Sequence, residues 1–189
     1  MALGSIILAG GAASRMGADK GALVWLDRRA IDRVAALARV AGAEALVSVG
    51  AADYGLPRVV EDPPLGGPVA GVLAGMAALR TLGCERGLVL AVDAPTIRLG
   101  DIAPLLAQDG AGAAFEGLHL PMLLAFAATP PDAKADWPLA RLADRAGLAR
   151  LACEPQARAR LRGANTPEER AVLIAELTAW EAAQKGGAD

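Results

Sequence analysis

Residues 6–20 read Ile6-Ile7-Leu8-Ala9-Gly10-Gly11-Ala12-Ala13-Ser14-Arg15-Met16-Gly17-Ala18-Asp19-Lys20, and the rest of the chain is interpreted around them. The apolar run 6–9 is short and begins with β-branched side chains, which is typical of a strand covered on both faces. Gly10 and Gly11 follow it, and paired glycines let a ligand lie against the backbone amides. Arg15 and Lys20 add two cations to a loop of small residues. The stretch predicts a buried strand that ends in a phosphate-binding loop.

The same stretch has a simpler interpretation. A Gly-Gly pair after a strand is often only a tight turn, and two cations are often only solvated surface side chains. The loop also has neither the Gly-Lys-Ser/Thr of a Walker loop nor the G-x-G-x-x-G of a dinucleotide-binding turn. We expect phosphate binding because Arg15 offers a forked donor and Lys20 a point charge around one small volume.

Length and composition indicate one domain, residues 1–189, with a core that needs neither a disulfide nor a metal. The formal net charge is −2, and the scattered basic residues predict no face for nucleic acid. Three Trp, two Phe and one Tyr also argue against base-stacking platforms.

The cysteines and the first apolar segment indicate the cellular compartment of the protein. Cys84 and Cys153 are isolated, so we expect neither a zinc cluster nor a disulfide framework, and a reduced cytoplasmic setting. The first apolar segment is too short to span a bilayer, lacks a basic leader and runs into the glycine loop. It predicts a strand, with no signal peptide and no membrane partner.

Strand and helix patterns alternate through most of the chain. The expected strands before residue 110 are 6–9, 45–49, 58–61 and 87–93, with an extended piece at 22–26. Helices are expected at 29–40, at 72–82 and from about 99. Farther on we expect paired strands at 113–116 and 121–126, a helix at 137–146, a strand at 148–153 and a closing helix to about 185. This order predicts an α/β fold, a three-layer sandwich with a mainly parallel, Rossmann-like sheet.

Two more segments are candidates for the site. Residues 62–71, Asp-Pro-Pro-Leu-Gly-Gly-Pro-Val-Ala-Gly, form a strand-to-helix turn that either brings backbone close to a ligand or is a rigid connector. Asp93 is the last residue of the expected strand 87–93, and ligands of open parallel sheets bind beyond the carboxyl ends of the strands. Asp93 is alternatively a cap for the helix near residue 99, although Asp101 is better placed for that role.

A fourth motif, Asn165-Thr166-Pro167-Glu168-Glu169, begins the closing helix. Thr166 as N-cap, Pro167 at the first helical position and Glu169 as the capping-box glutamate explain most of it without any function. Asn165 is the residue left to face a site.

Taken in order, these motifs resemble those of nucleotidyltransferases that attach a nucleoside monophosphate to a phosphorylated acceptor. Leu-Ala-Gly-Gly-x-x-x-Arg-Met-Gly-x-Asp-Lys looks most like the molybdenum cofactor guanylyltransferases, since cytidylyl- and uridylyltransferases more often have Ala-Gly after Leu-Ala. The segment 62–71, Asp93 before Pro95 and the Asn-Thr-Pro-Glu-Glu motif resemble the later motifs of that family.

Three departures from the family pattern stand out. The spacing between Asp62 and Gly67 is a little short, and Val92 and Ala94 replace the usual polar neighbours of the aspartate. The family has a polar residue directly before the proline that here is Pro121, whereas Leu120 separates it from His119. His119 is either that polar residue displaced by one position or a turn residue. We favour the turn, because a one-residue shift in a strand reverses the side.

The resemblance implies the fold of nucleotide-diphospho-sugar transferases and transfer of GMP from GTP to molybdopterin cofactor, with release of pyrophosphate. It implies Mg²⁺ held by Asp93, and protein partners among molybdoenzymes or other cofactor-synthesis proteins. The implied catalytic residues are Arg15, Lys20 and Asp93. The implied substrate-binding residues are Leu8, Ala9, Gly10, Gly11, Lys20, Asp62, Gly67, Gly71, Asp93 and Asn165.

Two other functions stay open from the sequence. One is a transferase of the same fold that uses another nucleotide or acceptor, such as CTP with molybdopterin, or a sugar phosphate. The other is a catalytically idle nucleotide-binding module. Arg15, Lys20 and Asp93 argue against the idle module, while the plain neighbours of Asp93 keep it open.

Overall fold

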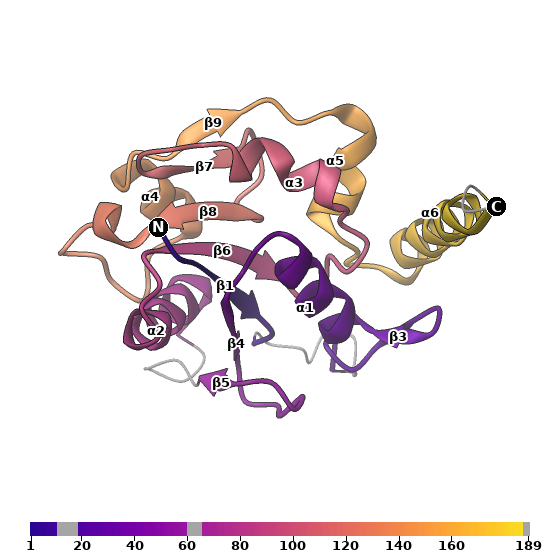
Figure 1. Cartoon of the computed structure of the whole chain (residues 1–189), viewed down its shortest axis with the longest axis horizontal. Coiled ribbons are helices and arrows are strands. Elements are labelled where there is room, and N and C mark those ends of the chain that lie inside the picture. The colour runs from indigo at the N-terminus through magenta and orange to yellow at the C-terminus, as the bar shows by residue number, and fades with distance from the viewer. Residues whose placement is uncertain (11–18, 60–65, 187–189) are drawn as a thin grey trace.

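The computed structural model describes residues 1–10, 19–59 and 66–186 (Figure 1). Of the residues expected in the site, Gly11, Arg15 and Asp62 therefore lie outside the described part of the chain. The predictions made for these three residues stay predictions.

A seven-stranded sheet forms the middle layer, in the order β5-β4-β1-β6-β8-β7-β9. All its neighbouring strands pair in parallel except β8, which is antiparallel to both β6 and β7. The carboxyl ends of β1, β4, β6 and β7 therefore lie at one edge of the sheet. The strands are β1 Leu3–Leu8, β4 Ala45–Val49, β5 Arg58–Val59, β6 Arg86–Ala91, β7 Gly112–Phe115, β8 Met122–Ala125 and β9 Ala149–Leu151.

Helices cover both faces of this sheet (Figure 1). Alternate residues of β1 point to opposite faces: Ile6 packs in a cluster with α2 and α4, and Ile7 in a cluster with α1, α3, α5 and α6. Both side chains are fully buried, as the apolar run predicts for a strand covered on two sides. The helices are α1 Ala30–Val40, α2 Pro68–Thr81, α3 Leu99–Leu106, α4 Leu139–Arg145, α5 Pro155–Arg162 and α6 Pro167–Gly186.

Helix α2 packs closely on the sheet because its inner face carries glycines. A Cβ on Gly75 would lie 2.7 Å from Ile6 Cγ2, and a Cβ on Gly71 would lie 2.9 Å from Leu8 Cδ2. The helix begins at Pro68, four residues before the expected start at 72, because proline suits the first turn and Gly67 adopts a positive φ of 94° before it.

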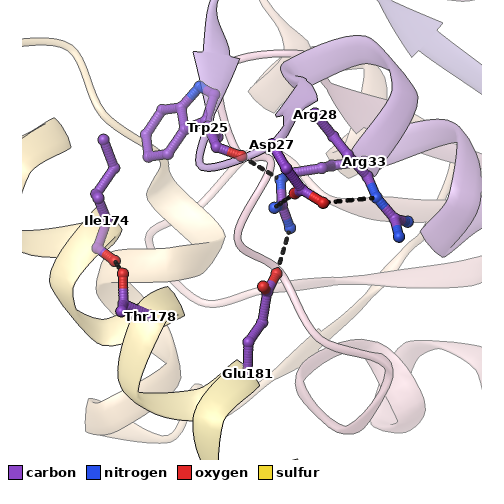
Figure 2. A network of polar contacts seen from close by, with 7 residues as sticks. All are labelled: Trp25, Asp27, Arg28, Arg33, Ile174, Thr178 and Glu181. Carbon is purple, nitrogen blue, oxygen red and sulfur yellow. Dashed lines mark hydrogen bonds and ion pairs between the residues drawn. The ribbon is translucent and has the colours of Figure 1, made fainter.

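The C-terminal helix α6 lies at one end of the molecule beside α1 and the small hairpin of β2 (Val24–Trp25) and β3 (Arg28–Arg29) (Figure 1). Arg33 of α1 joins the three elements. Its guanidinium donates to the Trp25 carbonyl at 2.9 Å, to Glu181 at 3.0 Å and to Asp27 at 2.9 Å (Figure 2). Leu173 and Leu177 are the buried residues of α6 and form the face that packs on the core.

Most expected elements are confirmed, including the antiparallel pairing of the strands near 113–116 and 121–126. Helix α5 was not expected from the sequence, and the short 3₁₀ turn Phe126–Ala128 extends the end of β8. Among the residues that the structure describes, no helix has the length and apolar character of a membrane span.

Candidate active site

The candidate site begins where β6 ends. The Val92 N–H donates to the Leu8 carbonyl at 3.1 Å, so β1 and the chain after β6 stay bonded up to the residue before Asp93. The Asp93 carbonyl then accepts the Ala164 N–H at 3.1 Å. Gly163 has a φ of 74°, and a Cβ there would lie 2.4 Å from the Asp93 carbonyl oxygen. Glycine therefore allows the segment 163–165 to lie directly against the end of β6.

Lys20 connects the two chain segments that meet there. Its Nζ donates to Asp93 Oδ2 at 3.1 Å and to Asn165 Oδ1 at 3.3 Å. The Lys20 and Asp93 side chains are 30% and 27% exposed, so the ion pair is partly shielded from water at the open edge of the sheet. One ammonium group is thus held by two oxygen atoms from distant parts of the sequence.

A tight turn presents Lys20. The Asp19 carboxylate accepts the Gly21 N–H at 2.9 Å, and the Asp19 carbonyl accepts the Ala22 N–H at 3.1 Å. The Gly21 carbonyl in turn accepts the N–H of Ile31, in the first turn of α1, at 3.1 Å. The backbone at Lys20 is therefore attached to the start of a helix.

The capping motif of α6 presents Asn165. As predicted, the Thr166 hydroxyl accepts the Glu169 N–H, at 3.2 Å. The Glu169 carboxylate reaches back to the Asn165 N–H at 2.8 Å, one residue earlier than in the usual capping box, and also pairs with Arg162. These two contacts, the backbone one foremost, hold the pKa of Glu169 below its ordinary value. The motif both starts the helix and fixes the backbone of Asn165.

Asp101, and not Asp93, caps helix α3. Asp101 Oδ2 accepts the Arg98 N–H at 2.9 Å. Both Asp101 oxygens also accept hydrogen bonds from Arg160, at 2.9 and 2.7 Å. The Asp93 carboxylate instead turns to Lys20, which removes the structural reason for the capping alternative.

The described part of the glycine loop lies at the same edge of the sheet. The Ala9 N–H donates to the Val49 carbonyl at 2.9 Å, and Gly10 is exposed. A Cβ on Gly50, directly after β4, would lie 2.8 Å from the Gly10 nitrogen. Gly50 thus makes room for Gly10, although the sequence analysis did not identify it; its place directly after a strand was the available signal.

Comparison with known proteins shows to which family the chain belongs. Residues 5–162 match the MobA-like NTP transferase domain. The chain belongs to that family. The match includes Gly10, Lys20 and Asp93, while Asn165 lies just beyond it.

Curated relatives cover only part of this MobA-like chain. A molybdenum cofactor guanylyltransferase from Xanthomonas euvesicatoria pv. vesicatoria is 40% identical over 123 residues, covering 63% of this chain and 62% of the relative. A protein of the same name from Pseudomonas fluorescens is 38% identical over 110 residues, covering 54% of this chain and 52% of the relative. The matched part thus spans between half and two thirds of these relatives' length.

Solved structures support the fold of the MobA-like chain. A nucleotidyl transferase from Methanothermobacter thermautotrophicus matches with a TM-score of 0.73 at 15% identity, covering 94% of this chain and 98% of that one. Molybdopterin-guanine dinucleotide biosynthesis protein A from Archaeoglobus fulgidus matches with a TM-score of 0.60 at 19% identity, covering 92% and 98%. At these identities the likeness confirms the expected Rossmann-like, three-layer α/β fold.

The two glycines expected in the second motif of this MobA-like chain differ in their surroundings. Gly67 is exposed before α2. Gly71 is buried, and a Cβ there would lie 3.3 Å from Val49 Cγ1 as well as close to Leu8. Helix packing alone explains a glycine at 71, so its contact with substrate stays a prediction. His119 lies exposed in the loop between β7 and β8, as the turn interpretation expects.

A small pocket continues behind Lys20 and Asp93. Arg170 stacks on the Trp25 ring at 5.3 Å and donates to the Val24 carbonyl at 2.5 Å. The sequence analysis missed Trp25 and Arg170, because the contact depends on how α6 packs against the hairpin. The pocket is lined by Lys20, Leu23, Trp25, Asp93, Ala164, Thr166 and Arg170.

The donor set at the site fits a magnesium ion that arrives with a nucleotide. Within the described ranges, no group of three or more His, Cys, Asp and Glu side chains gathers to hold a metal. Mg²⁺ commonly uses one or two protein oxygen ligands, substrate phosphates and water. Asp93 and Asn165 direct two oxygen atoms at one cation, the Lys20 ammonium, and both are of the hard type that Mg²⁺ prefers.

Proposed function

We propose that this chain is a molybdenum cofactor guanylyltransferase, which transfers GMP from GTP to molybdopterin cofactor and releases pyrophosphate. The observation that carries the proposal is the meeting of Lys20, Asp93 and Asn165 beside the glycine loop. Family membership makes nucleotidyl transfer the reaction class. The choice of guanylyl group and of acceptor is supported by five curated relatives at 36–41% identity, four named molybdenum cofactor guanylyltransferase and one named probable.

Charge is the main barrier to this reaction. An oxygen of the acceptor phosphate attacks the α-phosphorus of GTP in line, and both partners are anions. The Lys20 ammonium and the Gly10 amide would bind the triphosphate and offset the charge that grows on the leaving pyrophosphate. We propose the same role for Gly11 and Arg15. An ionised phosphate nucleophile needs no general base, so Lys20 and its neighbours act by binding and neutralisation.

Asp93 and Asn165 would hold Mg²⁺, whose charge, when bound, neutralises the phosphates and the leaving group. In the described structure Lys20 occupies the oxygen atoms of both residues. Binding of the triphosphate gives this ammonium phosphate oxygens in place of Asp93. The carboxylate is then available to the metal.

The remaining contacts complete the proposal. Leu8, Ala9, Asp62, Gly67 and Gly71 would line the guanine and ribose side of the nucleotide. We also propose that residues 1–189 form a single nucleotidyltransferase domain that works in the cytoplasm. Molybdoenzymes or other cofactor-synthesis proteins would receive the product.

A melting-temperature screen with Mg²⁺ and each of GTP, ATP, CTP and UTP tests the nucleotide. We expect GTP to give the largest rise, because the loop motif is of the guanylyl type. A ligand in large excess over its dissociation constant stabilises a folded protein by roughly 2–4 kcal/mol. The largest rise with CTP would move the assignment to the cytidylyl branch. No rise with any nucleotide would contradict nucleotide binding, and with it both the transferase and the idle nucleotide-binding module.

Pyrophosphate release with molybdopterin as acceptor tests the reaction. We expect Lys20→Ala to lower turnover by about 100-fold or more, since it removes a preorganised charge. Lys134→Ala is the matched control, because Lys134 is an exposed lysine of the 130–138 loop far from these contacts in sequence. Equal turnover in the two variants would contradict the role of Lys20.

A further inference from the structure

The turn that presents Lys20 is bonded to a tyrosine from another part of the sheet edge. Tyr54 lies in the loop 50–57 between β4 and β5, and it is 7% exposed. Its hydroxyl donates to Asp19 Oδ1 at 2.5 Å. The same oxygen accepts the Gly21 N–H at 2.9 Å. One carboxylate oxygen therefore fixes the residues on both sides of Lys20.

Tyr54 is itself held in place. Arg29 donates to the Tyr54 carbonyl at 3.2 Å, and the Arg29 guanidinium is fixed by Asp32 through bonds of 2.7 and 2.8 Å. Gly21 faces the ring, where a Cβ would lie 2.4 Å from the Tyr54 oxygen. The phenol therefore reaches Asp19 only because residue 21 has no side chain.

The chemistry of the contact suits a permanent hydrogen bond. Burial and the Asp19 carboxylate raise the pKa of the Tyr54 phenol well above its usual range, so the hydroxyl keeps its proton throughout the physiological range. A hydrogen bond from a neutral hydroxyl to a carboxylate is among the stronger ones in proteins. This strength matters because a lysine side chain has many rotamers, and its reach depends on where its backbone is fixed.

We propose that Tyr54 is a positioning residue for Lys20. Through Asp19 it fixes the turn 19–21, so that the ammonium is delivered to the Asp93 and Asn165 oxygens and then to the phosphates of the nucleotide. The inference rests on the proposed function, in which Lys20 neutralises phosphate charge. Small displacements of such a group cost large factors in rate because the reacting groups must be aligned.

Tyr54→Phe tests this, since it removes only the hydroxyl. We expect kcat for pyrophosphate release to fall about tenfold, which corresponds to the loss of one hydrogen bond to a charged group. The KM for GTP should change much less. In a Lys20→Ala background the same change has no further effect. Asp19→Asn is the second variant, and combined with Tyr54→Phe its loss of turnover is less than additive.

Asp53→Asn is the matched control in the same loop. The exposed Asp53 carboxylate accepts the Gly55 N–H at 2.8 Å and makes no bond to the Tyr54 hydroxyl. The Oδ1 atom of an asparagine can still accept the Gly55 N–H, so this variant changes the charge beside Tyr54 and keeps the turn that holds it. We expect this variant to keep wild-type turnover.

A measurement without turnover checks the contact itself. The chain has one tyrosine, so absorbance near 295 nm follows Tyr54 ionisation alone among tyrosines. We expect no phenolate in the folded protein near pH 10, and easier ionisation in Asp19→Asn. Ionisation at an ordinary pKa in the folded wild type would overturn the contact.

The turnover results separate the two proposals. Wild-type kcat in Tyr54→Phe, with Lys20→Ala inactive, would overturn the positioning role and leave the proposed function standing. A full tenfold loss that persists in the Lys20→Ala background would also overturn it, since Tyr54 would then act through something else. Wild-type turnover in Lys20→Ala would overturn the role of Lys20 and with it the positioning role of Tyr54, while the activity would stand. Absence of pyrophosphate release from the wild type itself would overturn the proposed function.

Discussion

Single residues at the site compensate each other's charge. Asp93 follows a strand whose Leu88 and Leu90 are fully buried, where an unpaired carboxylate would be costly. Lys20 supplies the compensating charge across 73 positions of sequence. At about 30% exposure the pair is worth far less than a buried one, since solvent screens it. Its importance therefore lies in placing the two groups together.

Asp93→Ala should nearly abolish Mg²⁺-dependent transfer while the protein stays folded. We expect a loss of about 100-fold or more in turnover, because a preorganised electrostatic group is removed. Melting temperature and pyrophosphate release are measured on one preparation. Asp136→Ala, at an exposed position, is the control. A capping role would instead give about 1 kcal/mol less stability with full activity.

At the scale of elements, the segment between α5 and α6 does two tasks. It ends one helix and starts the next, and it carries Asn165 to the end of β6. Gly163 provides the close approach to Asp93, and the capping residues Thr166 and Glu169 fix the exit. Local backbone chemistry thus determines a contact between distant parts of the chain.

Gly163→Ala should damage the site more than an equally strained glycine elsewhere. Its φ is 74°, and the new Cβ would meet the Asp93 carbonyl at 2.4 Å. Gly147→Ala is the control, since its φ is 70° and nothing lies within 4 Å of its Cβ position. We expect the control to lose about 1–2 kcal/mol and keep its turnover, and Gly163→Ala to lose more stability and most of its turnover. Equal effects in unfolding and activity assays would contradict this.

Glu169 should make stability depend on pH at the acid end. Its pKa is lowered from 4.5 by the Asn165 N–H and Arg162, so its contribution is present above pH 4.5 and is lost as pH falls through the lowered value. The melting-temperature difference between wild type and Glu169→Gln should be constant near neutral pH and shrink below that point. Glu168→Gln, in the same turn, should show a smaller difference throughout; a constant gap at all pH values would argue against the ionic contact.

Sequence reasoning succeeded where one local rule decides the outcome. The apolar strand at Ile6, the Thr166 cap and the Asp101 cap each depend on residues a few positions apart. It missed Tyr54 and Gly163 because their partners are set by the packing of distant segments. It missed α5 as well, since that helix is rich in arginine and shows a weak apolar stripe. For the residues outside the described ranges, the expectations from the sequence stay predictions.

At the scale of the whole molecule, two arginines from other elements hold α6 through its side chains. Arg33 is 10% exposed and bonds to Glu181, while Arg98 stacks on Trp180 at 5.0 Å. The helix that begins at the site is therefore also bound, near its C-terminal end, to α1, the helix that follows the Lys20 turn, and to the residue that precedes α3. The segments that carry Lys20 and Asn165 are therefore also connected away from the site, through the contact between α1 and α6.

Glu181→Gln should be more destabilising than a similar change at an exposed pair. Arg33 is nearly buried, so weakening its partner costs about 1–2 kcal/mol. Asp132→Asn, whose partner Arg145 is 49% exposed, should cost roughly 0.5 kcal/mol or less. Urea unfolding measures both, and equal losses would show that α6 is held by its apolar face alone.

The position of the Lys20 ammonium between Asp93 and Asn165 has a consequence for the order of binding. Before substrate binds, the Lys20 ammonium group occupies the position between the two oxygens. A divalent ion that binds without nucleotide must therefore compete with this ammonium group. A triphosphate removes the competitor by drawing it away, which couples the two affinities reciprocally. In the absence of nucleotide, Lys20→Met should therefore bind Mn²⁺ more tightly than the wild type does. The Mn²⁺ affinity of the wild type should rise when a nucleotide is present. The lysine would make metal and nucleotide enter as one unit.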